Sequence, residues 1–282
     1  MKQIFFSDVD GTLLAHLQEV SEAVRSAAIE YQRRGGLLAL CTGRSVKSLL
    51  PVANALQIAL PCIVCCGAGI YDIQDDRYIW HANFQDDILE RLHDVLRAYP
   101  SIAVQAFTLD DVLTLNMNGL LARRGIRAEQ ESGVQSVRAI QGDILKILLA
   151  SEDVPLLRRC CTTHFSGGDY TVEAASTHFV EITPAGVDKG TAVRKFLTLL
   201  RLEGFTICAA GDGRTDLPLL REAALRFAPE NAKPELKAIC HHIVPAAGEG
   251  GMAAAFSIAA ERLRGGPDRH PLWPCKNNCT CQ

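Results

Sequence analysis

The stretch Ile4-Phe5-Phe6-Ser7-Asp8-Val9-Asp10-Gly11-Thr12 decides the fold of this chain. Its apolar run, which ends at Phe6, is too short for a buried helix and is typical of a buried strand. Side chains alternate along a strand, so Asp8 and Asp10 are expected on the same side. Two carboxylates so close repel each other, and one of them stays protonated unless a cation lies beside them. Gly11 permits a sharp turn and a close approach of a ligand to the backbone.

A strand that ends in two carboxylates, a glycine and a hydroxyl suits Mg²⁺ and phosphate, because Mg²⁺ prefers hard oxygen ligands. The alternative is a strand followed by an ordinary Asp-Gly turn, which is common in proteins. The choice between a binding site and a plain turn depends on whether other segments place further polar residues near Asp8 and Asp10.

Composition places the chain among soluble globular proteins. With 282 residues, of which 48% are hydrophobic and 22% charged, it suits one large domain or two of ordinary size. The net charge of -3 and the absence of long like-charged blocks give no electrostatic footprint for nucleic acid or for a membrane surface. No apolar stretch approaches the length of a membrane span, and the N-terminal residues lack a signal-peptide pattern, so we expect a cytoplasmic protein.

The 11 cysteines fall into two groups. Eight lie in apolar segments, where a reducing cytosol favours small buried thiols over disulfides. The other three, Cys275, Cys279 and Cys281, lie near the C-terminal end of the chain. Their spacing permits Zn²⁺ binding with a fourth ligand such as His270, but it is not a typical zinc pattern, and an unstructured tail is the alternative.

A second strand follows the first after one helix. Ser21 is expected to cap that helix, whose apolar residues from Val24 to Tyr31 have helical spacing. Leu37 to Cys41 then form a short apolar strand, which predicts a parallel pair with a right-handed crossover. Thr42 and Gly43 follow at the sheet edge where Asp8 lies. A hydroxyl and backbone N–H groups at this edge can hold a phosphate, although a plain turn into the next helix explains them equally well.

Two later segments carry further polar residues. Lys189 lies in the first turn of a helix, where the helix dipole disfavours a cation unless an anion is nearby. A strand from Thr206 to Ala210 ends in a second acidic loop that contains Asp212 and Asp216. A strand-to-helix turn with Asp216 as the cap is the alternative, but two acidic loops, a hydroxyl loop and this lysine are an improbable coincidence.

The middle of the chain differs in pattern from both ends. It shows short strands and two helices without steady alternation, which is typical of a separate α+β insert. We expect the core at 1–81 and 184–266, the insert at 82–183 and a tail at 267–282, with 183–186 as the return linker. The fold class expected is α/β, a doubly wound and mostly parallel sheet with an inserted α+β domain.

Four segments together resemble the haloacid dehalogenase superfamily of phosphatases, and more narrowly its Cof-type members with a large α/β (type II) cap. The resemblance covers about 1–264 and rests on four motifs: Asp8 to Leu14, Leu40 to Arg44, Val187 to Gly190, and Gly211 to Asp216. Two further stretches, Ala228 to Ala232 and Gly248 to Gly251, also look like family features. The insert falls where such a cap would lie.

The resemblance assigns a separate role to each of these residues, which the residue types alone do not. Asp8 would be the nucleophile and Asp10 the general acid and base. Thr42, Gly43 and Lys189 would bind the phosphoryl group. Mg²⁺ would be held by Asp8, the backbone carbonyl of Asp10 and Asp212, with Asp216 acting directly or through a water molecule. The implied partner is a small phosphorylated metabolite, a sugar phosphate above all, and the chain would be a monomer or a small homo-oligomer.

Two positions depart from the family pattern. Thr215 stands where the family usually has Asn, and Cys66 stands where its third strand often ends in Asn. The resemblance leaves two alternatives to a phosphatase open, and only the second of them is suggested by these departures. One is a sugar phosphomutase, which returns the phosphoryl group to its substrate. The other is a sugar-phosphate sensor with little or no turnover.

Overall fold

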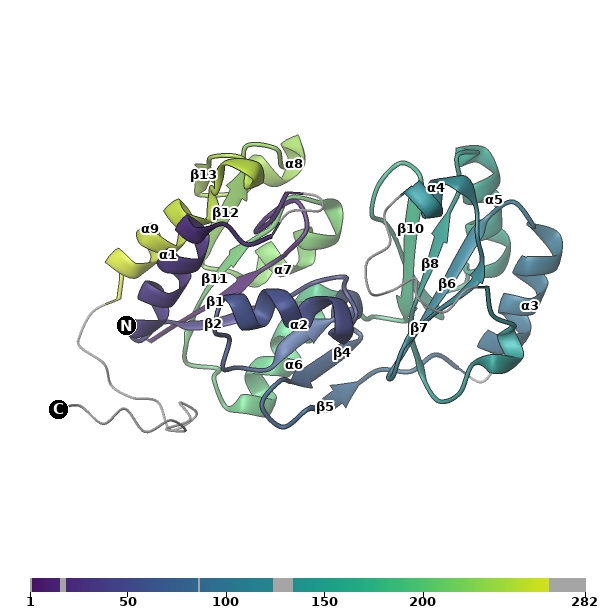
Figure 1. Ribbon diagram of the computed structural model, residues 1–282, viewed down its shortest axis with the longest axis horizontal. Coiled ribbons are helices and arrows are strands. Elements are labelled where there is room, and N and C mark those ends of the chain that lie inside the picture. Colours follow the sequence, from purple (N-terminus) through teal and green to yellow (C-terminus); the bar gives the residue numbers. More distant parts are fainter. Residues whose placement is uncertain (1, 16–18, 86, 124–133, 264–282) are drawn as a thin grey trace.

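The computed structural model describes residues 2–15, 19–85, 87–123 and 134–263. The cysteines near the C-terminal end and His270 lie outside these ranges. Figure 1 shows two bodies side by side, each built around its own sheet, with β5 and the start of α6 near the connections between them. The first and last parts of the chain form one body, and the middle forms the other.

The core sheet is parallel throughout. Its strand order is β13-β12-β11-β1-β2, where the strands are β1 (Gln3–Ser7), β2 (Leu37–Leu40), β11 (Thr206–Ala210), β12 (Leu225–Pro229) and β13 (His242–Val244). β1 pairs with β2 on one side and with β11 on the other. The chain therefore winds outward from β1 in both directions, which confirms the expected doubly wound fold.

Alternation along β1 explains why helices cover both faces of this sheet. Phe5 packs into the cluster that contains Tyr31 and Phe256, from α1 (Glu22–Arg33) and α9 (Met252–Glu261), and α2 (Val46–Ala55) joins the same cluster. Ile4 and Phe6 point the other way, into the cluster formed by α6 (Lys189–Leu200) and α7 (Leu217–Glu222). The short α8 (Pro234–Lys237) joins that second cluster. A strand buried on both faces reads as a continuous apolar run, as this one does.

The winding direction reverses between β1 and β11. Ligands in open α/β sheets bind beyond the carboxyl ends of the strands at such a switch point. Asp8 follows β1 directly, and Gly211 with Asp212 follows β11. The topology thus brings the two acidic loops next to each other.

A small antiparallel sheet, β3-β4-β5, extends the core toward the insert. It consists of β3 (Cys62–Val64), β4 (Gly69–Asp72) and β5 (Arg77–His81), and the last two form a hairpin. The apolar sequence predicts a third strand from Ile63 to Cys65, but β3 ends at Val64. Cys65 and Cys66 both have positive φ, at 50° and 59°, which breaks the extended backbone and starts a single 3₁₀ turn, η1 (Cys65–Gly67).

The insert sheet is antiparallel, in the order β7-β6-β8-β10-β9. Its strands are β6 (Ala103–Thr108), β7 (Val112–Asn116), β8 (Ile144–Ala150), β9 (Tyr170–Ala174) and β10 (Phe179–Pro184). The expected linker is partly wrong, because Thr183 and Pro184 continue β10 and pair with β9. We retain 82–183 as our proposal for the insert, since all five strands lie between 103 and 184.

The two faces of the insert sheet differ in polarity. Helices α3 (Ile88–Ala98) and α5 (Val154–His164) cover one face with an apolar cluster that includes Ile147 and Ile182. Figure 1 shows these helices on the side away from the core, and α4 (Gly119–Arg123) at one end. The face toward the core carries buried polar residues, among them Lys146 and Glu181. His93 lies exposed on α3.

Candidate active site

Lys189 joins two acidic residues from different loops. Its Nζ lies 2.6 Å from Asp8 Oδ1 and 2.6 Å from Asp216 Oδ1, and all three side chains are almost fully buried. Asp188 caps α6 in a capping box with Thr191, and this places Lys189 in the first turn. The helix dipole disfavours a cation in the first turn, and the carboxylates of Asp8 and Asp216 are the nearby anions that offset this effect.

Asp212 completes a group of three carboxylates. Ligand oxygens of Asp8, Asp212 and Asp216 all lie within 4.8 Å of one another. Thr12 donates a hydrogen bond to Asp212 Oδ1 at 3.0 Å. Gly11, with φ +87°, lies so close that a Cβ built on it would be 2.4 Å from Asp212 Oδ2. A side chain at position 11 would therefore push this carboxylate away.

The second carboxylate oxygen of Asp216 holds the acidic loop itself. Asp216 Oδ2 accepts hydrogen bonds from the backbone N–H groups of Asp212 and Gly213, both at 3.0 Å. Asp216 does stand at the N-cap position of α7, as the alternative expects, but its side chain makes no capping hydrogen bond to that helix. The residue instead fixes the turn that presents Asp212.

The negative charge of the three carboxylates exceeds the positive charge of Lys189. Burial, and then the charge of Asp216, raises the pKa of Asp8 well above its ordinary value. The same two causes raise the pKa of Asp212 to about 6. Burial lowers the pKa of Lys189, but the charges of Asp216 and Asp8 outweigh it and leave the pKa raised. One ammonium faces three carboxylates, so a bound cation would stabilise their charged forms.

The donor set fits Mg²⁺. Asp8, Asp212 and Asp216 offer hard carboxylate oxygens close to one another, and Mg²⁺ binds through a few carboxylates together with phosphate oxygens and water. Among the residues that the structure describes, this is the one group of at least three acidic, histidine or cysteine side chains with such spacing.

Asp10 is not a member of this group of three carboxylates. Its two oxygens accept hydrogen bonds from Arg44, from Nε at 2.7 Å and from a terminal nitrogen at 2.8 Å. Arg44 also donates to the backbone carbonyl of Ser48 at 3.0 Å. The Asp10 carboxylate is partly exposed, whereas the Arg44 side chain is mostly buried. Arg44 follows Thr42 and Gly43 in the sequence, but no pattern in the sequence pointed to it as the partner of Asp10.

Thr42 and Gly43 follow β2 at the edge where Asp8 lies. Ser7 pairs with Leu40, so Thr42 is two positions beyond the pair that precedes Asp8. The Thr42 hydroxyl is buried and accepts a hydrogen bond from the backbone N–H of Arg44 at 3.2 Å. The Gly43 carbonyl accepts a hydrogen bond from Lys146 of the insert.

Lys146 and Glu181 are polar residues that the sequence reasoning missed. Lys146 Nζ lies 2.8 Å from Glu181 Oε1, and the Cys66 thiol lies 2.9 Å from Glu181 Oε2. A Cβ on Gly43 would be 3.0 Å from both Cys66 Sγ and Glu181 Oε1, so the insert packs closely on this loop. The available signal was a single charged residue inside each of two apolar strands, ILKILLA and FVEITP.

Asn231 is a further residue to which the sequence gave no role, although it lies in a stretch that looks like a family feature. Its amide nitrogen donates to the carbonyl of Gly11 at 2.7 Å, and its amide oxygen accepts from the N–H of Ala247 at 2.8 Å. Both ends of the side chain are thus used, and they tie the loop after β12 to the turn at Gly11.

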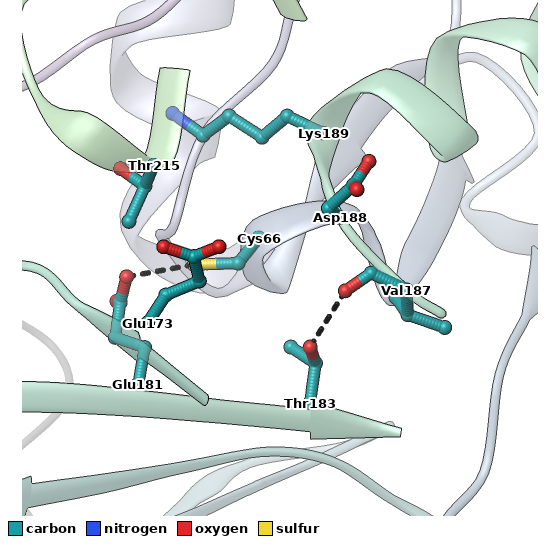
Figure 2. A pocket seen from close by; sticks show the side chains of 8 residues that line it. All are labelled: Cys66, Glu173, Glu181, Thr183, Val187, Asp188, Lys189 and Thr215. Atoms are coloured by element: carbon teal, nitrogen blue, oxygen red, sulfur yellow. Dashed lines mark hydrogen bonds between the residues drawn. The ribbon is translucent and has the colours of Figure 1, made fainter. Parts of the chain in front are cut away.

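A pocket adjoins Lys189 between the two bodies. Figure 2 shows the eight residues that line it: Cys66, Glu173, Glu181, Thr183, Val187, Asp188, Lys189 and Thr215. The core and the insert both contribute, so a molecule bound in it would touch both. No helix in the described part of the chain has the length and apolar character needed to cross a bilayer.

Comparisons with known proteins agree with this architecture. The family of haloacid dehalogenase-like hydrolases matches residues 5–256. A solved haloacid dehalogenase-like hydrolase from Bacteroides thetaiotaomicron has a similar fold, with a TM-score of 0.76 and 22% identity, over 92% of this chain and 100% of that one.

Two curated relatives match at similar identity and differ in length. YitU of Bacillus subtilis (strain 168), named a 5-amino-6-(5-phospho-D-ribitylamino)uracil phosphatase, is 25% identical over 260 residues, which cover 87% of this chain and 93% of that protein. A protein of Arabidopsis thaliana named chloroplastic endoribonuclease YBEY is 27% identical over 269 residues, 89% of this chain and 45% of that protein. The present chain thus spans less than half of the Arabidopsis relative. By the extent of the family match, the chain belongs to the haloacid dehalogenase-like hydrolases.

Proposed function

We propose that this chain is a Mg²⁺-dependent phosphatase that hydrolyses small phosphorylated metabolites, with sugar phosphates as the substrate class. The observation that carries the proposal is the contact of Lys189 with Asp8 and Asp216, both at 2.6 Å, beside the third carboxylate of Asp212. A phosphatase needs a nucleophile, a cation for the phosphoryl oxygens and a metal site in one place, and this group supplies all three.

Asp8 is the proposed nucleophile. Its carboxylate oxygen attacks phosphorus, the bond from phosphorus to the alcohol oxygen breaks, and an aspartyl-phosphate forms. Asp10 gives a proton to the departing oxygen. The Asp10 carboxylate is held by Arg44 in the structure, so this pair opens before Asp10 carries and transfers that proton.

Water completes the reaction. Asp10, now a carboxylate, takes a proton from a water molecule whose oxygen attacks phosphorus in the aspartyl-phosphate. The bond from phosphorus to Asp8 breaks, which releases inorganic phosphate and restores the Asp8 carboxylate. Asp10 ends with the proton that it needs for the next turnover.

Three residues are proposed to hold the phosphoryl group. Lys189 has three N–H donors, of which Asp8 and Asp216 take two, so the third is available to a phosphoryl oxygen. Thr42 and the backbone N–H of Gly43 bind the other oxygens. Asp8, Asp212, Asp216 and the backbone carbonyl of Asp10 would hold Mg²⁺, which offsets the repulsion between carboxylates and phosphate.

The departures from the family pattern do not favour the sensor. Hydrogen bonds support the acidic loop without the usual Asn, because Asp216 accepts from two of its backbone N–H groups while Thr215 lines the pocket. Cys66 donates to Glu181 of the insert and leaves Asp8, Asp10 and Lys189 untouched. Turnover is therefore the expected behaviour.

The substrate class is supported by the name of one relative. YitU is named for a phosphate ester on a ribityl chain, which is a sugar-like alcohol. The insert is the proposed cap, which excludes water and contacts the alcohol part of the substrate. A cytoplasmic location remains our proposal, and it agrees with the eight free cysteines in the described part of the chain, six of them buried.

The test is a screen of phosphorylated metabolites, including the compound that names YitU, for release of inorganic phosphate with and without Mg²⁺. We expect turnover that requires Mg²⁺ and falls by a factor of about 10³ or more in Asp8→Asn, because the amide is a poor nucleophile. Asp94→Asn, an exposed aspartate on α3, is the matched control and should retain full activity. Turnover by Asp8→Asn equal to that of the control would refute the proposal.

A further inference from the structure

The pocket beside Lys189 is where the alcohol part of a bound phosphate ester would lie. Lys189 lines the pocket and also contacts Asp8, so a phosphoryl group held by Lys189 would leave the rest of the molecule facing the insert. On that side the pocket is lined by Glu173, Glu181 and Thr183. The chemistry of these side chains therefore bears on which alcohol is accepted.

Two carboxylates from neighbouring strands of the insert sheet lie side by side in this pocket. Glu173 of β9 pairs directly with Glu181 of β10, and directly opposed residues project from the same face of a sheet. Like charges in this position repel, so each needs a partner. Glu181 has one, because Lys146 contacts its first oxygen at 2.8 Å and the Cys66 thiol contacts its second.

Glu173 has no such partner among the residues that the structure describes, where no hydrogen bond or ion pair reaches its carboxylate. Arg214 is the cation whose charge acts on it, and that guanidinium is paired with Glu235 at 2.8 Å. Burial, followed by the charges of Asp188 and Glu181, raises the pKa of Glu173. Its carboxylate is thus a half-buried acceptor that still lacks a donor.

The position of Glu173 directs this acceptor toward the site. Strand β9 contacts η3 (Arg214–Asp216), so the insert rests on the acidic loop at this point. Figure 2 shows the Glu173 side chain rising from its strand toward the side of the pocket where Thr215 and Lys189 lie. A ligand that extends from Lys189 into the pocket would meet this carboxylate.

We propose that Glu173 selects the alcohol part of the substrate: it favours alcohols that bear hydroxyl or ammonium groups and rejects those that bear a second anionic group. The inference rests on the proposed phosphatase function. Hydroxyl and ammonium groups donate the hydrogen bond that Glu173 lacks. A carboxylate or second phosphate would face Glu173, Glu181 and Asp188 in a site partly withdrawn from water, where like charges repel strongly.

The same selection bears on the phosphomutase alternative. A mutase of that kind keeps a sugar bisphosphate in its site, and the second phosphate of a bisphosphate would meet these carboxylates. Selection by Glu173 therefore favours hydrolysis of monophosphates.

The experiment measures binding of three compounds that share a phosphate on C6: glucosamine 6-phosphate, glucose 6-phosphate and 6-phosphogluconate. Dissociation constants are measured by calorimetry with Mg²⁺ in the Asp8→Asn variant, which does not consume them. We expect the ammonium and neutral compounds to bind at least about tenfold more tightly than the carboxylate compound. Adding Glu173→Gln should bring this ratio within about threefold, and adding Glu173→Lys should reverse the preference.

The matched control is Glu90→Gln, an exposed glutamate on α3 that lies outside the pocket, and it should keep the original ratio. A purely structural role of Glu173 would change all three dissociation constants together and leave their ratio unchanged. Three results would overturn the inference. The ratio of dissociation constants could stay unchanged in Glu173→Gln, or the pocket with Glu173 in place could prefer 6-phosphogluconate. Glucosamine 6-phosphate and glucose 6-phosphate could also fail to bind. Hydrolysis of p-nitrophenyl phosphate by the wild-type chain tests the proposed function separately.

Discussion

At the scale of single residues, the site depends on very close approach between loops. Gly11 leaves the space into which the Asp212 carboxylate fits, and Thr12 holds that carboxylate in place. Lys189 then offsets part of the negative charge from its position on α6. Each of these residues belongs to a different turn, so a small displacement of one turn changes the distances between all the carboxylates.

Gly11→Ala tests this close approach. A Cβ at position 11 would lie 2.4 Å from Asp212 Oδ2, so we expect the Asp212 carboxylate to move and Mg²⁺ to bind at least about tenfold more weakly. Gly35→Ala is the control, since Gly35 also has a positive φ, +92°, but no atom within 4 Å of the added Cβ. Both variants lose about 1 kcal/mol of stability from backbone strain. Calorimetric titration with Mg²⁺ distinguishes them, and equal affinities would contradict the argument.

At the scale of elements, strand ends and helix caps fix where the loops begin. Ser21 accepts a hydrogen bond from the backbone N–H of Val24 at 3.4 Å and so starts α1, as the sequence predicted. The helix packs with α9 over Phe5, which lies three residues before Asp8. The stability of α1 therefore supports the strand that presents Asp8.

Ser21→Ala should lower the free energy of unfolding by about 1 kcal/mol, because a backbone N–H in the first turn loses its acceptor. Ser26→Ala, an exposed serine whose hydroxyl donates to Glu22 on the same helix, should cost only a few tenths of a kcal/mol. Urea unfolding followed by circular dichroism measures both. Equal losses in the two variants would show that the cap does not stabilise α1.

At the scale of the whole molecule, a buried ion pair connects the two bodies. Lys146 and Glu181 both belong to the insert sheet, and they reach the core through the carbonyl of Gly43 and the thiol of Cys66. Lys146 Nζ also lies 4.0 Å from the centre of the Phe107 ring. Gly43 is one of the residues proposed to bind the phosphoryl group, so the insert contacts the loop that would hold the substrate.

Lys146→Met should lower the free energy of unfolding by about 3–5 kcal/mol, since it leaves the Glu181 carboxylate buried without its cation. The double variant Lys146→Met/Glu181→Leu should recover most of that loss, because no buried charge remains. Arg123→Met removes the exposed partner of Glu152 and should cost about 1 kcal/mol or less. Urea unfolding measures all three, and a loss in Lys146→Met no larger than in Arg123→Met would contradict the proposed role of the pair.

The sequence by itself determined the parallel core and which loops carry the acidic residues. Three features depend only on residues that are close in sequence: the apolar run at Ile4 to Phe6, the strand from Thr206 to Ala210 and the Ser21 cap. Such local features can be predicted without knowing how distant parts of the chain pack. Because parallel strands end at one edge, knowing the strands was enough to predict that Asp8 and Asp212 come together.

Only the tertiary structure decided which side chains pair with each other. Asp10 pairs with Arg44 and is not one of the three grouped carboxylates, and Lys146 reaches Gly43 across 103 positions of sequence. Glu173 is left without a partner in the described part of the molecule. Such choices depend on how two bodies pack and on which charges burial brings within a few ångströms, and no spacing along the chain encodes a distance between residues so far apart in sequence.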